Sequence, residues 1–203
     1  MTAAAALCTR YPQRGRNHME QQKKNDWALQ QLNAAEAKVI RNIEQIGERF
    51  PTVARNGRYQ TMEHPMEWTD GFWPGMLWLT YARTGEKKAK ALAERCEERM
   101  DALLCIPENT AHDVGFMWTL SAVANYKLTK NPMSRRRGYR AAKYLASRFN
   151  PVGYIRSWGD IPGENTESWS IADNLMNLPI LYWAAKEWAE PGFSMIAKRH
   201  TDT

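Results

Sequence analysis

The sequence predicts an all-α protein made of helical hairpins, and two observations carry this prediction. Apolar residues recur at steps of three and four through most of the chain, as they do on one face of a helix. No stretch shows a convincing alternation of period two, which a half-buried strand would need. With 203 residues, 43% of them hydrophobic and 25% charged, the chain has the composition of a folded protein with a core of its own.

The first expected helix follows a polar N-terminal arm, residues 1–25, which we expect to be disordered or loosely attached. The apolar face of this helix is formed by Leu32, Val39, Ile43, Ile46 and Phe50. Pro51 ends the pattern, because proline lacks the N–H that the next helical turn requires.

The later helices are expected at residues 72–84, 86–105, from 113 onward, 132–149 and 170–188, and another begins near Phe193. Gly85 stands just after the first of these, where helices commonly end. The apolar stripes of the next three consist of Leu92, Cys96, Met100 and Leu103, then Phe116, Leu120 and Val123, then Tyr139, Ala142, Leu145 and Phe149. Pro179 is expected to kink or break the helix at 170–188.

Charge and cysteine content limit the classes of partner and compartment. The net charge of +6 favours an anionic partner but does not distinguish nucleic acid from an acidic sugar. The basic run Arg135 to Arg137 is expected on a solvated helix face. Cys8, Cys96 and Cys105 form no CxxC pair, and free thiols suit a reducing cytoplasm. No segment approaches the ~18 uninterrupted apolar residues of a membrane span, so no membrane partner is expected.

Three of the expected helices open with an aspartate. "TDGFWPGMLWLTYARTG" from Thr69 aligns with "HDVGFMWTLSAVANYKLTK" from His112 if one residue is skipped, and "ADNLMNLPILYWAAKEW" from Ala172 follows more loosely. In stacked hairpins, Asp70, Asp113 and Asp173 would gather at one end. Each could be a helix cap, because aspartate accepts hydrogen bonds from the free N–H groups at a helix start. A cap, however, does not explain the neighbouring aromatic and imidazole side chains, namely Trp68, Trp73, Trp158 and His112.

These stretches resemble glycoside hydrolase family 88, the unsaturated glucuronyl hydrolases. The residues that carry the resemblance are "EWTDGFWPGMLWLTYARTG", "HDVGFMWTLSA", "SWGD" and "IADNLMNLPILYWAA", and the likeness extends from about Trp27 to the last residue. The resemblance implies an (α/α)6 toroid, six helical hairpins in a ring, of which residues 26–203 would form the first half of the catalytic domain. Family members continue for almost as many residues again. We therefore expect an incomplete toroid, a truncated and inactive form being one possibility, and self-association through the uncovered half-ring.

The resemblance also assigns roles to residues. Asp173 corresponds to the catalytic acid/base and Asp113 to the second carboxylate of the site. Trp68 and Trp158 correspond to walls of the sugar pocket, and His112 stands where the family often has histidine. Asp70 is expected to cap its helix. Phe72, Met76 and Leu79 are expected in the core.

The implied activity removes a terminal C4=C5 unsaturated glucuronic acid from oligosaccharides that polysaccharide lyases leave behind. It hydrates the vinyl ether of that sugar and needs no metal ion or cofactor, and the chain shows no HExxH and no Cys/His cluster. The implied partner is an unsaturated uronic-acid oligosaccharide, and neither nucleic acid nor a membrane. Two alternatives stay open: an unsaturated rhamnogalacturonyl hydrolase, and a non-catalytic helical fragment that binds sugar or protein.

Overall fold

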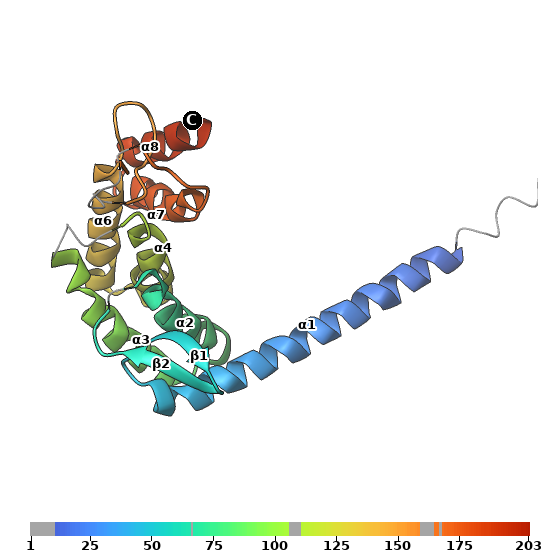
Figure 1. Cartoon of the computed structure of the whole chain (residues 1–203). Helices are drawn as coiled ribbons and strands as arrows, with labels where there is room; N and C mark the ends of the chain where they lie inside the picture. The colour runs from blue at the N-terminus through green and yellow to red at the C-terminus, as the bar shows by residue number, and fades with distance from the viewer. Residues whose placement is uncertain (1–10, 66, 106–110, 159–164, 167) are drawn as a thin grey trace, which may run out of the picture. The chain divides into compact units, whose positions relative to one another are not determined.

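The computed structural model describes residues 11–65, 67–105, 111–158, 165–166 and 168–203, with side chains from Glu20 onward (Figure 1). The chain divides into two compact units, residues up to Arg41 and residues 42–203, and each is described by itself. In the described ranges no helix combines the length and apolar character that crossing a membrane requires. Cys8 and the first residues of the expected arm lie outside the described part, and the boundary at residue 25 stays a prediction.

The chain is mainly helical, as the sequence predicts. Its helices are α1 (Tyr11–Ile46), α2 (Phe72–Thr84), α3 (Lys87–Met100), α4 (Val114–Trp118), α5 (Ala124–Thr129), α6 (Pro132–Ser147), α7 (Asn174–Glu187) and α8 (Pro191–Asp202). Short 3-10 helices at Trp68–Gly71 and Leu103–Cys105 and a π turn at Thr119–Val123 complete the helical structure of the described residues.

A β-hairpin corrects the expectation that the chain contains no strand. β1 (Phe50–Arg55) pairs with β2 (Arg58–Met62) in an antiparallel ladder that joins Arg55 to Arg58 and is irregular between Pro51 and Val53. Asn56 and Gly57 form the turn with φ values of 50° and 72°. Both residue types accept positive φ, and Asn-Gly is the strongest short hairpin signal in a sequence. The period-two pattern is weak because most side chains of these two strands are exposed on both faces.

α2 begins and ends at the predicted residues, but its buried face is not the predicted one. Trp73, Leu77 and Trp78 are buried, and the Trp73 indole donates a hydrogen bond to the Gly47 carbonyl at 3.0 Å. The expectation that Phe72, Met76 and Leu79 are core is wrong: they are 40%, 41% and 71% exposed. α2 is apolar on both faces, so periodicity does not decide which face the core takes.

α3 and α6 differ from expectation in two respects. Leu92, Cys96 and Met100 are buried on α3 as predicted, although the helix ends at Met100 rather than at 105. On α6 the arginine run is not a simple solvated face. Arg137 makes two 2.7 Å bonds to the Asp101 carboxylate, and Arg135 donates to Glu187 at 2.7 Å. The expectation holds for Arg136, which is exposed.

Two helices continue through features that usually interrupt them. α4 and α5 form one run with the π turn between them, in which Ser121 donates back to the Met117 carbonyl. α7 contains Pro179 in its interior without ending there, so the predicted break does not occur. Proline at this position removes one backbone hydrogen bond, and the buried residues on either side, Leu178 and Ile180, hold the helix in place.

The helices α2, α4 and α7 run parallel, with α4 between the other two. Gly71, just before α2, lies against Met117 of α4, and Gly75 of α2 lies against Leu120 of the π turn. Gly115 of α4 lies against Asn177 of α7. Residue numbers rise together in the first pair of helices, and in the second pair the contact of His112 with Asp173 precedes that of Gly115 with Asn177. All three helices therefore begin at the same end of the unit. α3, α6 and α8 alternate with them along the chain and pack against them.

Candidate functional site

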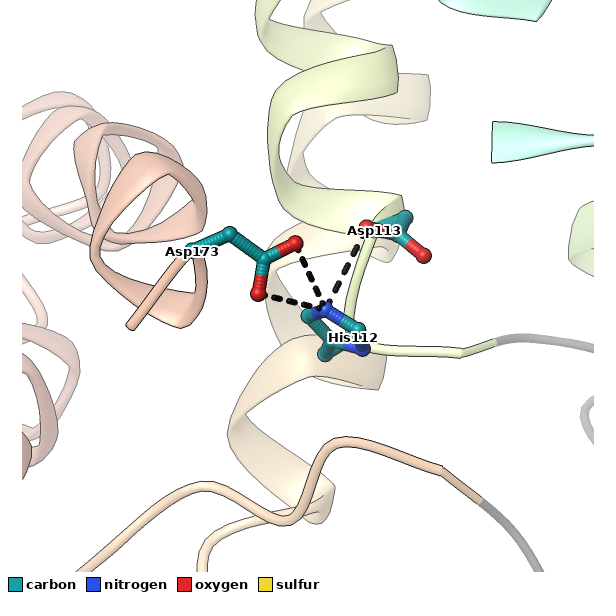
Figure 2. Close-up of side chains that lie close together, drawn as sticks. All are labelled: His112, Asp113 and Asp173. Carbon is teal, nitrogen blue, oxygen red and sulfur yellow. Dashed lines mark hydrogen bonds and ion pairs between the residues drawn. The ribbon is translucent and has the colours of Figure 1, made fainter. Parts of the chain in front are cut away.

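The starts of α4 and α7 bring together an imidazole and two carboxylates (Figure 2). Nε2 of His112 lies 3.2 Å from Oδ1 of Asp173 and 3.3 Å from Oδ1 of Asp113. The imidazole is buried, whereas the Asp113 and Asp173 side chains are 14% and 47% exposed. The three side chains thus form a cluster that reaches from the interior to the surface.

The two carboxylates do not cap the helices that they precede. Asp113 and Asp173 occupy the N-cap positions of α4 and α7, but neither side chain bonds to a backbone N–H of its own helix start. Asp70 behaves in the opposite way. Its Oδ2 accepts from the Glu67 backbone N–H at 2.8 Å, and the Glu67 side chain completes a capping box. Asp70 therefore takes part in capping the 3-10 helix Trp68–Gly71 and does not cap α2 itself, whose N-cap is Gly71, and Asp113 and Asp173 cap no helix.

A backbone carbonyl on the side opposite the carboxylates fixes the orientation of the His112 ring. Its Nδ1 lies 2.6 Å from the Ser157 backbone carbonyl, which can only accept, so Nδ1 carries a proton. The Ser157 hydroxyl accepts from the Ile171 N–H at 3.0 Å, which ties this carbonyl to the approach of α7. In a neutral ring with Nδ1 protonated, the Nε2 lone pair would face carboxylate oxygens. The contact is attractive when a proton or another cation lies between Nε2 and the two carboxylates.

The surroundings favour the protonated form of Asp113. Burial raises the pKa of its carboxyl above the ordinary value, and the negative charge of Asp173 adds to the increase. His112 opposes both effects. Asp113 is therefore a weaker acid than an exposed aspartate, and the role of Asp173 as proton donor stays a prediction.

A close contact between α4 and α7 sets the separation of the two carboxylates. The Asn177 side chain accepts from the Phe116 N–H at 2.8 Å across the two helices. Gly115 faces the same residue, and a Cβ at Gly115 would lie 2.5 Å from the Asn177 Cβ. No other residue fits at this position without moving the helices apart.

Aromatic side chains border the cluster in two groups. The Trp158 ring stands edge-on to His112 with 5.8 Å between centroids and equally far from Trp169. Trp68, 53% exposed, contacts Phe72 and Phe116 at 6.0 and 6.1 Å. Trp158 thus contacts the cluster directly through His112. Trp68 is linked to the cluster through Phe116, which lies one helical turn after Asp113. Both roles in sugar binding stay predictions.

The cluster also has the composition of a metal site. One ligand atom from each of the three residues lies within 4.8 Å of the others. Among the described residues this is the group of histidine and carboxylate side chains that could hold an ion, and its arrangement equally suits a shared proton.

The sequence did not identify several residues that build the site. Ser157, Asn174 and Asn177 link the loop before α7 to α4 and α7, and Trp169 extends the aromatic group. The signal for the two asparagines was their position one and four residues after Asp173, on one face of the first helical turn. The backbone role of Ser157 leaves no signal in its side-chain type.

No protein-family model matches the chain. The curated relatives include the unsaturated glucuronyl hydrolase of Bacillus sp. (strain GL1), which is 34% identical over 166 residues, 79% of this chain and 43% of the relative. The unsaturated chondroitin disaccharide hydrolase of Streptococcus pyogenes serotype M1 is also 34% identical, over 84% of this chain and 43% of the relative. A crystal structure of the Bacillus sp. GL1 unsaturated glucuronyl hydrolase superposes with a TM-score of 0.77 at 33% identity, covering 83% of this chain and 45% of that one.

The chain therefore resembles the unsaturated glucuronyl hydrolases over about 80% of its length. It spans less than half the length of the curated relatives that it matches. The solved unsaturated glucuronyl hydrolases have the (α/α)6 toroid fold, and the parallel helices α2, α4 and α7 with their partners form part of such a ring.

Proposed function

We propose that this chain carries the proton-transfer residues of an enzyme that removes a terminal C4=C5 unsaturated glucuronic acid from lyase-derived oligosaccharides. The observation that supports this most directly is the pair Asp113 and Asp173, which leave their cap positions unused and share His112. A helix start that gives up its cap loses stability. A pair of carboxylates held around one proton is what acid/base chemistry requires.

The chemistry is a hydration. Asp173, the more exposed carboxyl, delivers a proton to C4 of the unsaturated ring, and positive charge develops at C5 and the ring oxygen. Water adds at C5 and gives up its proton to the carboxylate that Asp173 has become. The resulting hemiketal opens and releases the rest of the oligosaccharide. Asp113 holds sugar hydroxyls or returns a proton to the cluster, and His112 fixes both carboxylates.

The printed names of the relatives agree with this reaction. One solved relative is described as specific for heparin, and a Streptococcus agalactiae unsaturated glucuronyl hydrolase was solved as Asp-to-Asn variants, one of them in complex with dGlcA-GalNAc6S. The two aspartates changed in those variants are separated along their chain by the same interval that separates Asp113 from Asp173. This coincidence supports the assignment of both residues.

The test measures loss of the ultraviolet absorbance of the C4=C5 bond on a panel of unsaturated disaccharides from chondroitin, heparin and gellan lyases. We expect turnover by the unchanged chain, its loss in Asp173→Asn, and its retention in Asp202→Asn, an exposed aspartate on α8. The amide keeps the shape of the carboxyl but delivers no proton. Retained turnover in Asp173→Asn would show that the proton donor is misassigned.

Two alternatives make different predictions in the same assay. An unsaturated rhamnogalacturonyl hydrolase would act on fragments from rhamnogalacturonan lyases and leave the glucuronyl panel intact. A non-catalytic module, which the partial coverage of the relatives favours, would bind the disaccharides without consuming them. The reaction uses no metal ion or cofactor, so we expect turnover to persist in EDTA. A cytoplasmic location, without a nucleic-acid or membrane partner, completes the proposal.

A further inference from the structure

Besides His112, the described residues include a buried histidine on α8. His200 is 8% exposed and follows Phe193 and Ala197 at steps of four and three, so all three lie on the buried face of this helix. Such a position usually carries an apolar side chain, because burying a polar group is unfavourable unless the group forms a hydrogen bond. The His200 ring therefore needs a partner.

The partner is a backbone N–H in the connection between α6 and α7. Ile155, which is fully buried, donates its N–H to Nδ1 of His200 at 3.1 Å. Nδ1 of His200 accepts this bond and so carries no proton, and the proton of the neutral ring is on Nε2. Burial lowers the pKa of His200, which favours the neutral ring. In His112 the protonated nitrogen is the other one, Nδ1, which donates to the Ser157 carbonyl.

Ile155 and Ser157 belong to one short segment that supports the cluster. The Ile155 carbonyl accepts from the side chain of Asn174, the first residue of α7, at 2.8 Å. Two residues later, the Ser157 carbonyl accepts from both the backbone N–H and Nδ1 of His112, at 3.2 and 2.6 Å. His200 therefore holds one end of the segment whose other end orients the imidazole of the cluster.

The bond to His200 differs from the other backbone bonds of residues 155–157. The N–H groups of Arg156 and Ser157 donate to backbone carbonyls, at 3.0 and 2.9 Å. The Ile155 N–H instead donates to a side chain. A substitution at position 200 can therefore remove this one bond and leave the backbone bonds of its neighbours in place.

We propose that His200 is a positioning residue of the site, whose Nδ1 holds residues 155–157 and thereby the carbonyl that orients His112. Without an acceptor at position 200, the buried Ile155 N–H has to turn toward another partner, because a buried donor left unsatisfied is unfavourable. That movement carries the Ser157 carbonyl with it and releases Nδ1 of His112. The effect on catalysis rests on the proposed reaction, whereas the effect on the His112 ring does not.

The experiment observes the histidine rings of the whole chain by proton–nitrogen correlation NMR. The chain has four histidines, and replacing His18 and His64 by glutamine leaves the two buried rings. In this background, His112 should show a slowly exchanging proton on Nδ1, and His200 a proton on Nε2 and none on Nδ1. His200→Leu and His200→Asn form a matched pair, because the two side chains have nearly the same shape and only asparagine offers an acceptor in the place of Nδ1.

His200→Leu should displace or abolish the Nδ1 proton signal of His112, and His200→Asn should keep it. On an unsaturated disaccharide, kcat should fall about tenfold in the leucine variant, the effect expected from one hydrogen bond, and KM should change less. The asparagine variant should stay close to the unchanged chain. Ala197→Gly is the control for a merely structural role: it weakens α8 one turn before His200 and should leave both ring signals unmoved.

A proton on Nδ1 of His200 would overturn the proposal, as would a folded His200→Leu chain with an unaltered His112 signal. An equal displacement of that signal in His200→Asn or in Ala197→Gly would do so as well. If the leucine variant does not fold, His200→Gln replaces it, because its acceptor lies one bond further from the backbone, and an unaltered His112 signal there would also overturn the proposal. The expected ring signals in a chain that consumes no disaccharide would contradict the proposed reaction and support the positioning role.

Discussion

The carboxylate of Asp70 accepts a hydrogen bond from the Glu67 backbone, whereas those of Asp113 and Asp173 turn away from their helix starts to His112. The three residues occupy similar places in sequence, before an apolar helix that begins at the same end of the unit. They differ in which side chains lie near the carboxylate. Only the last two have a buried imidazole within reach, and that imidazole is oriented by a distant backbone carbonyl.

Stability should separate the three aspartates. Asp70→Ala removes a cap and should lower the free energy of unfolding by about 1 kcal/mol, the usual effect of losing a helix cap. Asp113→Asn and Asp173→Asn remove no cap and should change it much less. Denaturant unfolding followed by circular dichroism measures all three. If Asp173→Asn lost as much stability as Asp70→Ala, the carboxylate would have a structural role that its contacts do not show.

A buried glutamate on α3 gives a pH dependence with a defined sign. Burial raises the pKa of Glu97 above its ordinary value of 4.5, although Ser134, Asn125 and Arg137 oppose this effect. The positive charge of Arg137 is compensated mainly by Asp101. The folded chain therefore keeps the Glu97 proton at pH values where the unfolded chain has released it. The stability that this contributes is complete below about pH 4.5 and is lost as the pH rises through the folded pKa.

Glu97→Gln should remove this loss. The variant and the unchanged chain should be similarly stable at acidic pH, and the variant should gain in relative stability as the pH rises toward neutrality. Urea unfolding at a series of pH values measures the difference. Glu98→Gln changes the exposed neighbour and serves as the control with a flat difference. A Glu97→Gln variant that became relatively less stable with rising pH would mean that the ion pair with Arg137 outweighs burial.

At the scale of elements, the sequence predicted most helices because their ends carry chemical signals. α2 ends before Gly85, which has a φ of 73°. α6 begins after Asn131, whose side chain accepts from the Met133 and Ser134 backbone N–H groups, and Pro132 occupies its first turn. The hairpin had the equally clear Asn56-Gly57 turn, but its exposed strands show little alternation. The continuation of α7 through Pro179 depends on packing by other helices, which no local pattern records.

The contact between α4 and α7 makes a prediction about an element pair. Gly115→Ala places a methyl group against Asn177 and should destabilise the chain by about 1 to 3 kcal/mol, the usual cost of overpacking. It should also reduce binding of an unsaturated disaccharide, because Asp113 and Asp173 move apart. Gly192→Ala on α8 meets nothing within 4 Å and is the control. Thermal melts and titration calorimetry measure the two effects, and unchanged binding in a destabilised Gly115→Ala would separate the contact from the site.

At the scale of the whole molecule, the sequence indicated the ring but not which helix faces it covers. The aspartates at 70, 113 and 173 and the spacing of the hairpins were enough to predict parallel helices with a common end. The buried face of α2 depends on α3, which packs against this helix, and on the Gly47 carbonyl, which accepts from the Trp73 indole. A helix that is apolar all round is suited to a position with neighbours on every side, and periodicity alone does not say which of them are present.

The thiols report on the opening of the whole unit. Cys96 is buried and burial raises the pKa of its thiol to about 12, whereas Cys105 is exposed. In a Cys8→Ser background, a thiol reagent should label Cys105 at once and Cys96 only as fast as the unit opens. Mass spectrometry over time measures both sites. Labelling of Cys96 should accelerate in Asp70→Ala and in Gly115→Ala, and equal rates for the two thiols in the unchanged chain would show that the core around α3 is loosely packed.

The π turn between α4 and α5 stores an extra residue inside an otherwise regular helix. Residues before the turn, Asp113 among them, face α7. Asn125, after the turn, donates a hydrogen bond to Glu97 in the core. Deleting one residue within 119–123 would restore an ordinary helix but rotate one side against the other by roughly 100°. The site and the core therefore both depend on this turn, because they rely on opposite sides of it.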